Sequence, residues 1–170
     1  MNRTLQSVIV GVMAWATIGA AARAANQSKS AFAFEHLTSL VGEWNGVQDG
    51  TEIQLSYTLT ANGSVLMEEF RPKNGPTMVT MFSVNGDRLL ATHYCSAKNQ
   101  PQMATEAIVD PQAKSLAFSL VRVTGLSSPG DWHNTGLVVT MEDRDHLTQD
   151  WTYLSNGKTG KTFFHFTRVR

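Results

Sequence analysis

The sequence predicts an all-β fold, an antiparallel up-and-down β-barrel of about ten strands with a short N-terminal helix. Short runs rich in Thr, Val, Tyr, Phe and Trp fill the chain after Gly42, and Gly, Asn, Pro and Asp separate them. Asn-Gly turns join consecutive runs at three places and an Asp-Gly turn joins another pair, as tight hairpins require. Since only the connection 124–134 is long, we expect the strands to pair in chain order and to close.

Each element is expected from its local pattern. Apolar residues between 34 and 41 recur at helical spacing, which predicts one short helix that ends at Gly42. A barrel with about this number of strands encloses room for one small ligand. The expected strands cover 43–48, 51–60, 64–71, 77–84, 87–95, 102–109, 115–123, 135–142, 146–154 and 161–169.

The first residues predict a secretory signal peptide. A positive charge at Arg3 precedes an apolar run over 8–22, and small residues flank Arg23. A short run with small residues at its end is typical of a cleaved signal rather than of a membrane span. We therefore expect cleavage after Ala24 and export to the periplasm or beyond, with no membrane partner after cleavage. The expected segments are a signal peptide at 1–24, a short tether at 25–31 and a single barrel domain at 32–170.

The charge and the cysteine content restrict the possible partners. Lys and Arg number 14, Asp and Glu number 14, and the net charge at pH 7 is zero. Because nucleic-acid-binding proteins carry a cationic face and this sequence has no basic cluster, we expect no nucleic-acid partner. Cys95 is the single cysteine of the chain, so we expect no internal disulfide and a buried thiol.

The segment 87–95 alternates in a way that predicts which side chains enter the barrel. Successive side chains of a strand point to opposite faces, so His93 and Cys95 share one face and Tyr94 lies on the other. The face of His93 carries the smaller and more typically buried residues, and we expect it to point inward. The predicted ligand-binding residues for a small, partly apolar molecule are His93, Cys95, Met103, Glu69, Gln149 and Trp151, beside Met81, with Trp132 and His133 on a loop over the mouth.

Two alternatives to simple binding stay open at this point. A metal site would need a third ligand beside His93 and Cys95, for which His133 is the candidate; since two ligands are too few, no metal is assigned. A small enzyme would use His93 with Glu69 or Cys95. The sequence contains no nucleophile elbow, phosphate-binding glycine loop or zinc-protease helix, so we assign no catalytic residue and no cofactor.

A motif at the start of the first strand resembles that of a known superfamily. The segment LVGEW, residues 40–44, is similar to the Gly-any-Trp signature of lipocalins and their calycin relatives, in which a short helix precedes the motif. The resemblance implies that an arginine of the last strand packs over the tryptophan. Arg168 is the matching residue and Arg170 the second choice, and a guanidinium on an indole face gains cation–π attraction. The structural signature would be Gly42, Trp44 and Arg168.

Two further resemblances bear on function. The segments THYC (92–95), NQP (99–101) and DWT (150–152) resemble those of a group of exported bacterial proteins for which no activity is established. The nitrobindins, a calycin branch with ten strands, bind haem through a histidine on a late strand, and His165 occupies a similar place. This resemblance implies a haem- or metal-binding protein as an alternative, for which His165 would have to face an open apolar cavity.

Overall fold

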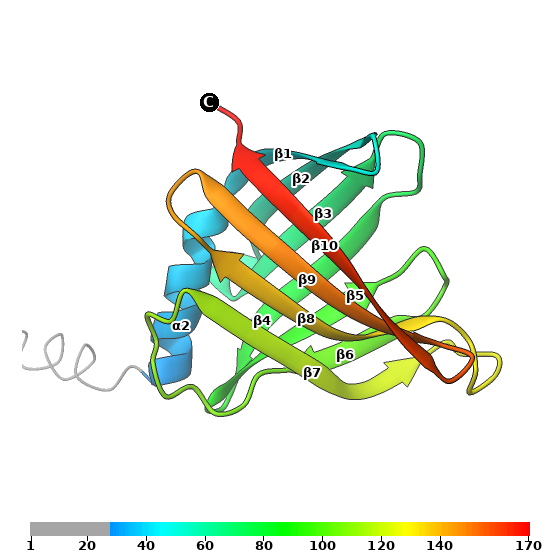
Figure 1. The fold of residues 1–170 in the computed structure, drawn as a ribbon. Helices are drawn as coiled ribbons and strands as arrows, with labels where there is room; N and C mark the ends of the chain where they lie inside the picture. The colour runs from blue at the N-terminus through cyan, green and yellow to red at the C-terminus, as the bar shows by residue number, and fades with distance from the viewer. Residues whose placement is uncertain (1–27) are drawn as a thin grey trace, which may run out of the picture.

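The structure, a computed structural model that describes residues 28–170, is a closed antiparallel barrel of ten strands with a short helix against one end (Figure 1). The predicted fold class is therefore confirmed. The predicted signal peptide and the first residues of the tether lie outside the described residues. Helix α2 spans Lys29–Leu37 and a 3₁₀ turn spans Thr38–Leu40, followed by β1 Gly42–Gln48, β2 Thr51–Thr60, a 3₁₀ turn Ala61–Gly63, β3 Val65–Pro72, β4 Met78–Asn85, β5 Arg88–Tyr94, β6 Gln100–Ala104, β7 Ser115–Thr124, β8 His133–Met141, β9 His146–Ser155 and β10 Lys158–Arg168.

Neighbouring strands of the barrel are consecutive in the chain, and the pairing of β1 with β10 closes the ring. Two of the predicted tight turns adopt the left-handed backbone at both central residues: φ is +49° at Asp49 and +79° at Gly50, and +49° at Asn156 and +73° at Gly157. The β4–β5 turn is centred one residue later than predicted, on Gly86 and Asp87, because Asn85 pairs with Arg88. No helix within residues 28–170 has the length and apolar character to cross a membrane.

Strand β6 is shorter than predicted and ends at Ala104 instead of reaching 109. The hydroxyl of Thr105 accepts a hydrogen bond from the backbone N–H of Leu89 at 3.1 Å, so a side chain replaces a carbonyl of the ladder. The backbone N–H of Ile108 still donates to the carbonyl of Asp87 at 2.9 Å. The chain therefore follows β5 as an irregular segment as far as Ile108.

Helix α2 begins earlier than the sequence pattern predicts. Ser28 is its N-cap and accepts a hydrogen bond from the backbone N–H of Ala31 at 3.2 Å. The hydroxyl of the buried Ser30 donates to the carbonyl of Gly86 in the β4–β5 turn at 2.6 Å. Residues 29–31 thus belong to the helix. Apolar spacing alone places the start of the helix later, because it does not include the Ser28 cap.

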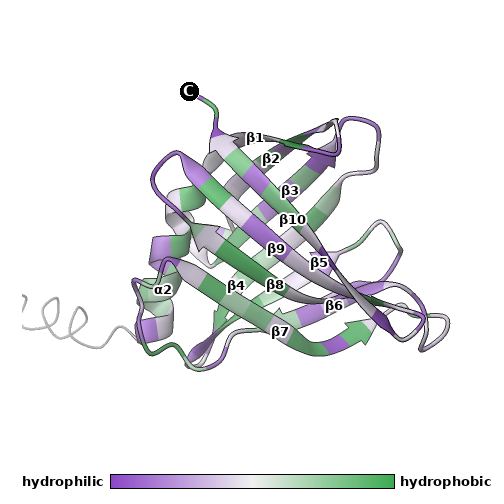
Figure 2. Cartoon of the chain, viewed as in Figure 1, coloured by the Kyte–Doolittle hydropathy of each residue, from purple (hydrophilic) through white to green (hydrophobic). Residues whose placement is uncertain are grey.

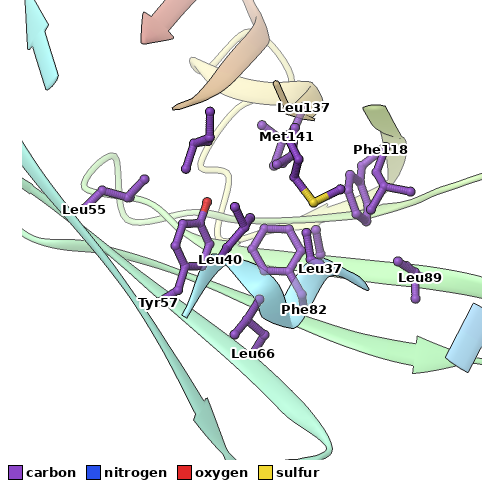
Figure 3. Close-up of a cluster of buried hydrophobic side chains, with 14 of the residues drawn as sticks. Leu37, Leu40, Leu55, Tyr57, Leu66, Phe82, Leu89, Phe118, Leu137 and Met141 are labelled. Atoms are coloured by element: carbon purple, nitrogen blue, oxygen red, sulfur yellow. The ribbon is translucent and has the colours of Figure 1, made fainter. Parts of the chain in front are cut away.

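Buried apolar side chains fill the half of the barrel next to α2. Hydrophobic and hydrophilic residues alternate along the strands, so that one set enters the barrel (Figure 2). The rings of Phe82 and Phe118 lie 5.6 Å apart between their centroids. We call this group the helix-side core; Figure 3 shows much of it, and its members are Leu37, Leu40, Leu66, Phe82, Leu89, Phe118 and Met141.

The packing of an arginine over the first-strand tryptophan, which the resemblance implies, is present. Trp44 is buried, and its indole N–H donates to the carbonyl of Leu40 at 2.8 Å. The guanidinium carbon of Arg168 lies 4.1 Å from the centroid of the indole ring. The same guanidinium donates to the carbonyls of Ser39 and Val41 at 2.8 and 2.9 Å, which ties the helix end to the last strand.

Gly42 permits this approach. Its φ is +133°, and a Cβ there would lie 2.9 Å from Nη1 of Arg168. Any other side chain would therefore strain the backbone and displace the guanidinium. Arg170, the second choice for this role, instead pairs with Asp145 at 2.7 Å and is largely exposed.

Candidate functional site

A cavity of about 120 Å³ lies inside the barrel, away from helix α2. Strand β5 starts beside the turn that contacts the helix, and His93 lies near its other end. Trp132 belongs to the long β7–β8 connection at that same far end. We call this the mouth-side cavity; its lining residues are Glu68, Phe70, Met78, His93, Trp132, Asn134, Trp151, Thr162 and Phe164.

Four polar side chains form a row across β2, β3, β4 and β5. Strand register places Tyr57 opposite Glu68, Glu68 opposite Thr80, and Thr80 opposite His93. Each is buried, and Glu68 is 0% and His93 3% exposed. Directly opposed residues of neighbouring strands lie close enough for side chains to interact. We call these four residues the polar row.

The polar row is hydrogen-bonded in series, with Glu68 at its centre. Tyr57 donates its hydroxyl to Oε2 of Glu68 at 2.6 Å, and Thr80 donates to Oε1 at 3.1 Å. Gln149 reaches across the barrel from β9, and its amide donates to Oε2 of Glu68 at 2.6 Å and to the Tyr57 hydroxyl at 2.9 Å. All three groups thus direct donors at one carboxyl group.

Burial sets the charge states of this row. It raises the pKa of Glu68 above its usual range, although the hydrogen bonds from Tyr57, Gln149 and Thr80 act in the opposite direction. Burial is also the main cause, ahead of the nearby Glu68 carboxyl, of a Tyr57 pKa well above its ordinary value. Burial lowers the pKa of His93 to about 4, so its imidazole is neutral at neutral pH.

The hydrogen bonds also fix the orientation of the His93 imidazole. Thr80 has one hydroxyl hydrogen and donates it to Glu68. The 3.0 Å contact between Thr80 Oγ1 and His93 Nδ1 therefore requires Nδ1 to carry the proton and donate. In a neutral imidazole this leaves Nε2 as an acceptor, on a ring that lines the cavity.

The structure brings together four of the predicted site residues. His93 and Trp151 both point inward, as expected, and their ring centroids lie 4.8 Å apart. The indole N–H of Trp151 donates to Oε1 of Gln149 at 2.9 Å. Trp132 lines the cavity from the long connection and is 38% exposed. The inward face predicted for Ala91, His93 and Cys95 is confirmed by their burial, since Tyr94 between them is exposed.

Glu69 and Met81 do not point inward, and the sequence interpretation of their strands is wrong. The carboxylate of Glu69 lies on the outer face, where Nη1 of Arg71 donates to it at 3.2 Å. Strands β3 and β4 present the other alternating set to the interior, so the inward carboxyl belongs to Glu68 and the inward methionine is Met78.

Cys95, Met103 and His133 are buried but do not line the cavity. Cys95 directly follows β5, and its Sγ accepts from the backbone N–H of Ala97 at 3.4 Å within the turn there. Met103 belongs to the apolar core. His133 starts β8, and its Nδ1 lies 2.8 Å from the carbonyl of Asp131.

The alternatives that the sequence left open are not assembled in the structure. No group of three or more His, Cys, Asp or Glu side chains suited to a metal occurs within residues 28–170, so His133 does not join His93 and Cys95. Over the same residues the hydrogen bonds of His93 link it to Thr80 and not to Cys95 or Glu69. The enzyme pairs proposed from sequence are therefore absent from the described part of the chain.

The residues do not fit a haem held by His165. Its imidazole lies on the outer face of β10, 52% exposed, and Nε2 is 3.9 Å from a carboxylate oxygen of Glu142. A cavity of about 120 Å³ is also smaller than the roughly 300 Å³ at which drug-sized ligand pockets begin. His165 is therefore an outward-facing residue of the barrel wall.

Several residues of the site are not among those predicted from the sequence. A usable signal was present for Glu68, because Leu66 and Phe70 flank it at two-residue spacing and define the apolar face of β3. The same spacing links Tyr57 to the buried Leu55. The remaining missed residues are Phe70, Met78, Thr80, Asn134, Thr162 and Phe164.

Hydrogen bonds hold the β7–β8 connection at two points, one of them from the backbone N–H of Asn156 to the carbonyl of Gly130 at 2.9 Å. The amide of Asn99 donates to the carbonyl of Trp132 at 2.7 Å. The Trp132 ring packs against Tyr153 with centroids 5.4 Å apart. The other amide atom of Asn99, Oδ1, is buried without a partner among the described residues. Asn99 thus latches the segment that carries Trp132, and we call it the loop latch.

A larger groove of about 1130 Å³ lies outside the barrel between helix α2 and the β8–β9 turn. Its lining includes Glu35, Lys114 and Arg144, and it opens to solvent. Arg168, which borders it, already bonds three backbone carbonyls. The mouth-side cavity is the better candidate site, because its polar groups are buried and converge on one volume.

No family model matches the chain, and no curated protein matches it. Among solved structures, the chain is similar to the crystal structure of Rv2717c from M. tuberculosis, with a TM-score of 0.54. Sequence identity is 12%, and the match covers 81% of this chain and 98% of that one. At this identity the likeness shows the fold alone, a barrel compatible with binding a small ligand.

Proposed function

We propose that the protein is an exported binding protein that holds one small, partly apolar molecule in the mouth-side cavity. The observation that carries the proposal is the convergence of three buried polar residues, Glu68, His93 and Asn134, with aromatic side chains on one interior volume. Mostly apolar linings with a few placed polar groups are typical of ligand sites. We further propose a relationship to the calycins, which the contact between Trp44 and Arg168 supports.

The volume limits the size of the ligand. An apolar cavity of roughly 150 Å³ is enough to bind benzene, and the cavity here measures about 120 Å³. The ligand therefore has on the order of five to seven non-hydrogen atoms, unless the loop with Trp132 moves aside. Haem and long-chain lipids exceed this size.

A pair of substitutions on one strand tests where the ligand binds. Thr162 lines the cavity, whereas Thr167 lies five residues further along β10 on the outer face and is exposed. Ligand binding is followed by the fluorescence of Trp132 and Trp151, which border the cavity. We expect Thr162→Phe to weaken binding at least about tenfold by filling the cavity, and Thr167→Phe to leave it unchanged.

Two results would contradict the binding proposal. One is wild-type affinity in the Thr162→Phe variant, which would place the ligand elsewhere. The other is the failure of the wild-type protein to bind any member of a broad panel of small polar and apolar molecules, together with the absence of a retained molecule in native mass spectrometry.

Export is a separate part of the proposal with its own test. The order of charge, apolar run and small residues over 1–24 supports it. Cleavage after Ala24 would leave 170 − 24 = 146 residues. The intact mass of protein recovered from outside the cytoplasm should match this length, and a mass that still includes residues 1–24 would contradict the cleavage.

A further inference from the structure

The charge of Glu68 has no counter-charge in the described part of the chain. Its hydrogen-bond partners there, Tyr57, Thr80 and Gln149, are all neutral. His93, the other titratable group on the cavity, is neutral and reaches Glu68 through Thr80 alone. A buried ion without a partner is costly, and the cost falls when an opposite charge is placed beside it.

The donors around Glu68 are arranged for its ionised form. Two hydrogen bonds of 2.6 Å and one of 3.1 Å all run toward the carboxyl oxygens. Several donors to a carboxylate favour the charged state, which burial opposes. The two tendencies conflict while the cavity lacks a positive group, and a cationic ligand would resolve the conflict.

The remaining lining suits a cation as well. Nε2 of His93 is an acceptor, so both titratable groups on the lining accept hydrogen bonds, beside the neutral polar side chains of Asn134 and Thr162. The aromatic residues on the lining are Phe70, Trp132, Trp151 and Phe164. Aromatic ring faces attract ammonium groups, most strongly where water is excluded.

We propose that the mouth-side cavity binds a small primary ammonium ion, whose charged group pairs with Glu68 and whose short alkyl part contacts the aromatic lining. This inference rests on the proposed binding function and names its ligand class. One N–H of the ammonium group donates to Glu68 and a second to Nε2 of His93. The alkyl part is limited by the cavity volume of about 120 Å³.

The substitution Glu68→Gln reverses the hydrogen-bond polarity of the row. The carbonyl oxygen of the new amide accepts from Tyr57 and Gln149, and its NH₂ group donates to Thr80. Thr80 then donates to His93 Nδ1, so His93 Nε2 becomes a donor. One substitution of equal size therefore removes the charge and one of the two acceptors offered to the ligand.

Calorimetric titration of the mature protein with isobutylammonium and with isobutanol tests the inference. The two probes have nearly the same shape and differ in charge. We expect the wild-type protein to bind the ammonium at least about tenfold more tightly, since hydrogen bonds to charged groups are the stronger ones. Glu68→Gln should abolish or invert this preference. Glu69→Gln, which changes the neighbouring outward carboxylate, should retain it.

The possible outcomes distinguish the proposal that the ligand is an ammonium ion from the proposal that the cavity binds a small molecule. Equal or tighter binding of isobutanol by the wild-type protein overturns the ammonium inference and leaves a neutral-ligand site standing. Binding of neither probe overturns the inference, and the broad panel above then decides the binding function. The comparison of the two probes on wild-type protein decides the inference even if Glu68→Gln does not fold. A preference for the ammonium that survives Glu68→Gln in a folded protein also overturns it.

Discussion

The helix-side half of the barrel interior is filled by apolar side chains, whereas the mouth-side half holds the polar row and a cavity. The helix-side core includes fully buried Leu37, Phe82 and Leu89, and α2 packs against the strands at that end (Figures 1 and 3). On the other side of Tyr57 and Glu68, hydrogen bonds link the four members of the polar row to one another, but the volume beside them is not filled.

The difference shows how one barrel can separate stability from binding. Dense apolar packing at one end stabilises the fold by removing apolar surface from water. At the other end, a fixed hydrogen-bond network borders a cavity that side chains do not fill. The network also prevents the polar side chains from collapsing into the cavity, because each already has a partner. We therefore expect substitutions at the two ends to have different consequences.

The largest effect is expected from truncating a phenylalanine in the filled half. Phe82→Ala removes a fully buried ring next to Phe118 and should lower the free energy of unfolding by about 3–5 kcal/mol in urea titrations. Phe164→Ala, on the cavity wall, should cost about 2 kcal/mol or less, because a void already adjoins this half-buried ring. Equal costs would show that the two ends are packed alike.

A pH-dependent effect is expected from His93. The folded protein binds its proton only below about pH 4, whereas the unfolded chain binds it near 6.5. The free energy of unfolding should therefore fall as the pH drops from 6.5 to 4, by up to roughly 3 kcal/mol relative to His93→Gln. Glu68 has the opposite effect: because its pKa is raised, the free energy of unfolding falls as the pH rises above the usual pKa of a glutamate. The pH profile of His93→Gln is therefore subtracted from that of the wild type, since both proteins contain Glu68.

His146 provides the surface control for this measurement. Its pKa is raised by the hydrogen bond from its imidazole to the Asp143 carboxylate. The stability that it contributes is present below pH 6.5 and is lost as the pH rises through the raised value. His146→Gln should thus change the pH profile with the opposite sign. A profile for His93→Gln that parallels the wild type would contradict the neutral, buried state of His93.

The smallest effect is expected from the loop latch. Asn99→Ala removes the hydrogen bond to the Trp132 carbonyl but also a buried, unpartnered oxygen, so global stability should change by less than about 1 kcal/mol. Amide hydrogen exchange over 125–132 should accelerate by roughly fivefold. Gln102→Ala, whose side chain bonds Arg122 instead, should leave this segment unchanged. Unaltered exchange in Asn99→Ala would show that the latch does not hold the loop.

The sequence predicts the barrel and its end closure well, because these depend on local patterns. Asn-Gly turns determine the hairpins, and Gly42 with Trp44 and Arg168 marks the junction of the first and last strands. The inward face of β5 was also predicted, since His93 alternates with the exposed Tyr94. Each of these features follows from residues close together in the chain or from one motif.

The composition of the site was predicted less well, for a physical reason. Alternation assigns a residue to a face of the sheet but not to a height along the barrel axis. Met103 faces inward yet lies in the apolar core. Which of the adjacent carboxylates, Glu68 or Glu69, points inward follows only from the apolar residues that flank Glu68. The hydrogen bond between Gln149 and Glu68 spans 81 residues of sequence. Such distant convergence has no local signal.

The pairing of Trp44 with Arg168 has a consequence for how the chain reaches its native state. The ring of strands is completed only when residues near position 168 pair with β1 and bond the carbonyls of Ser39 and Val41. Until then the growing chain forms an open, curled sheet with two unpaired edge strands. Strands of different molecules associate at such edges. Synthesis therefore delivers β10, which closes the ring, after the other nine strands, and removal of the residues around 168 should reduce solubility more than the few lost contacts would indicate.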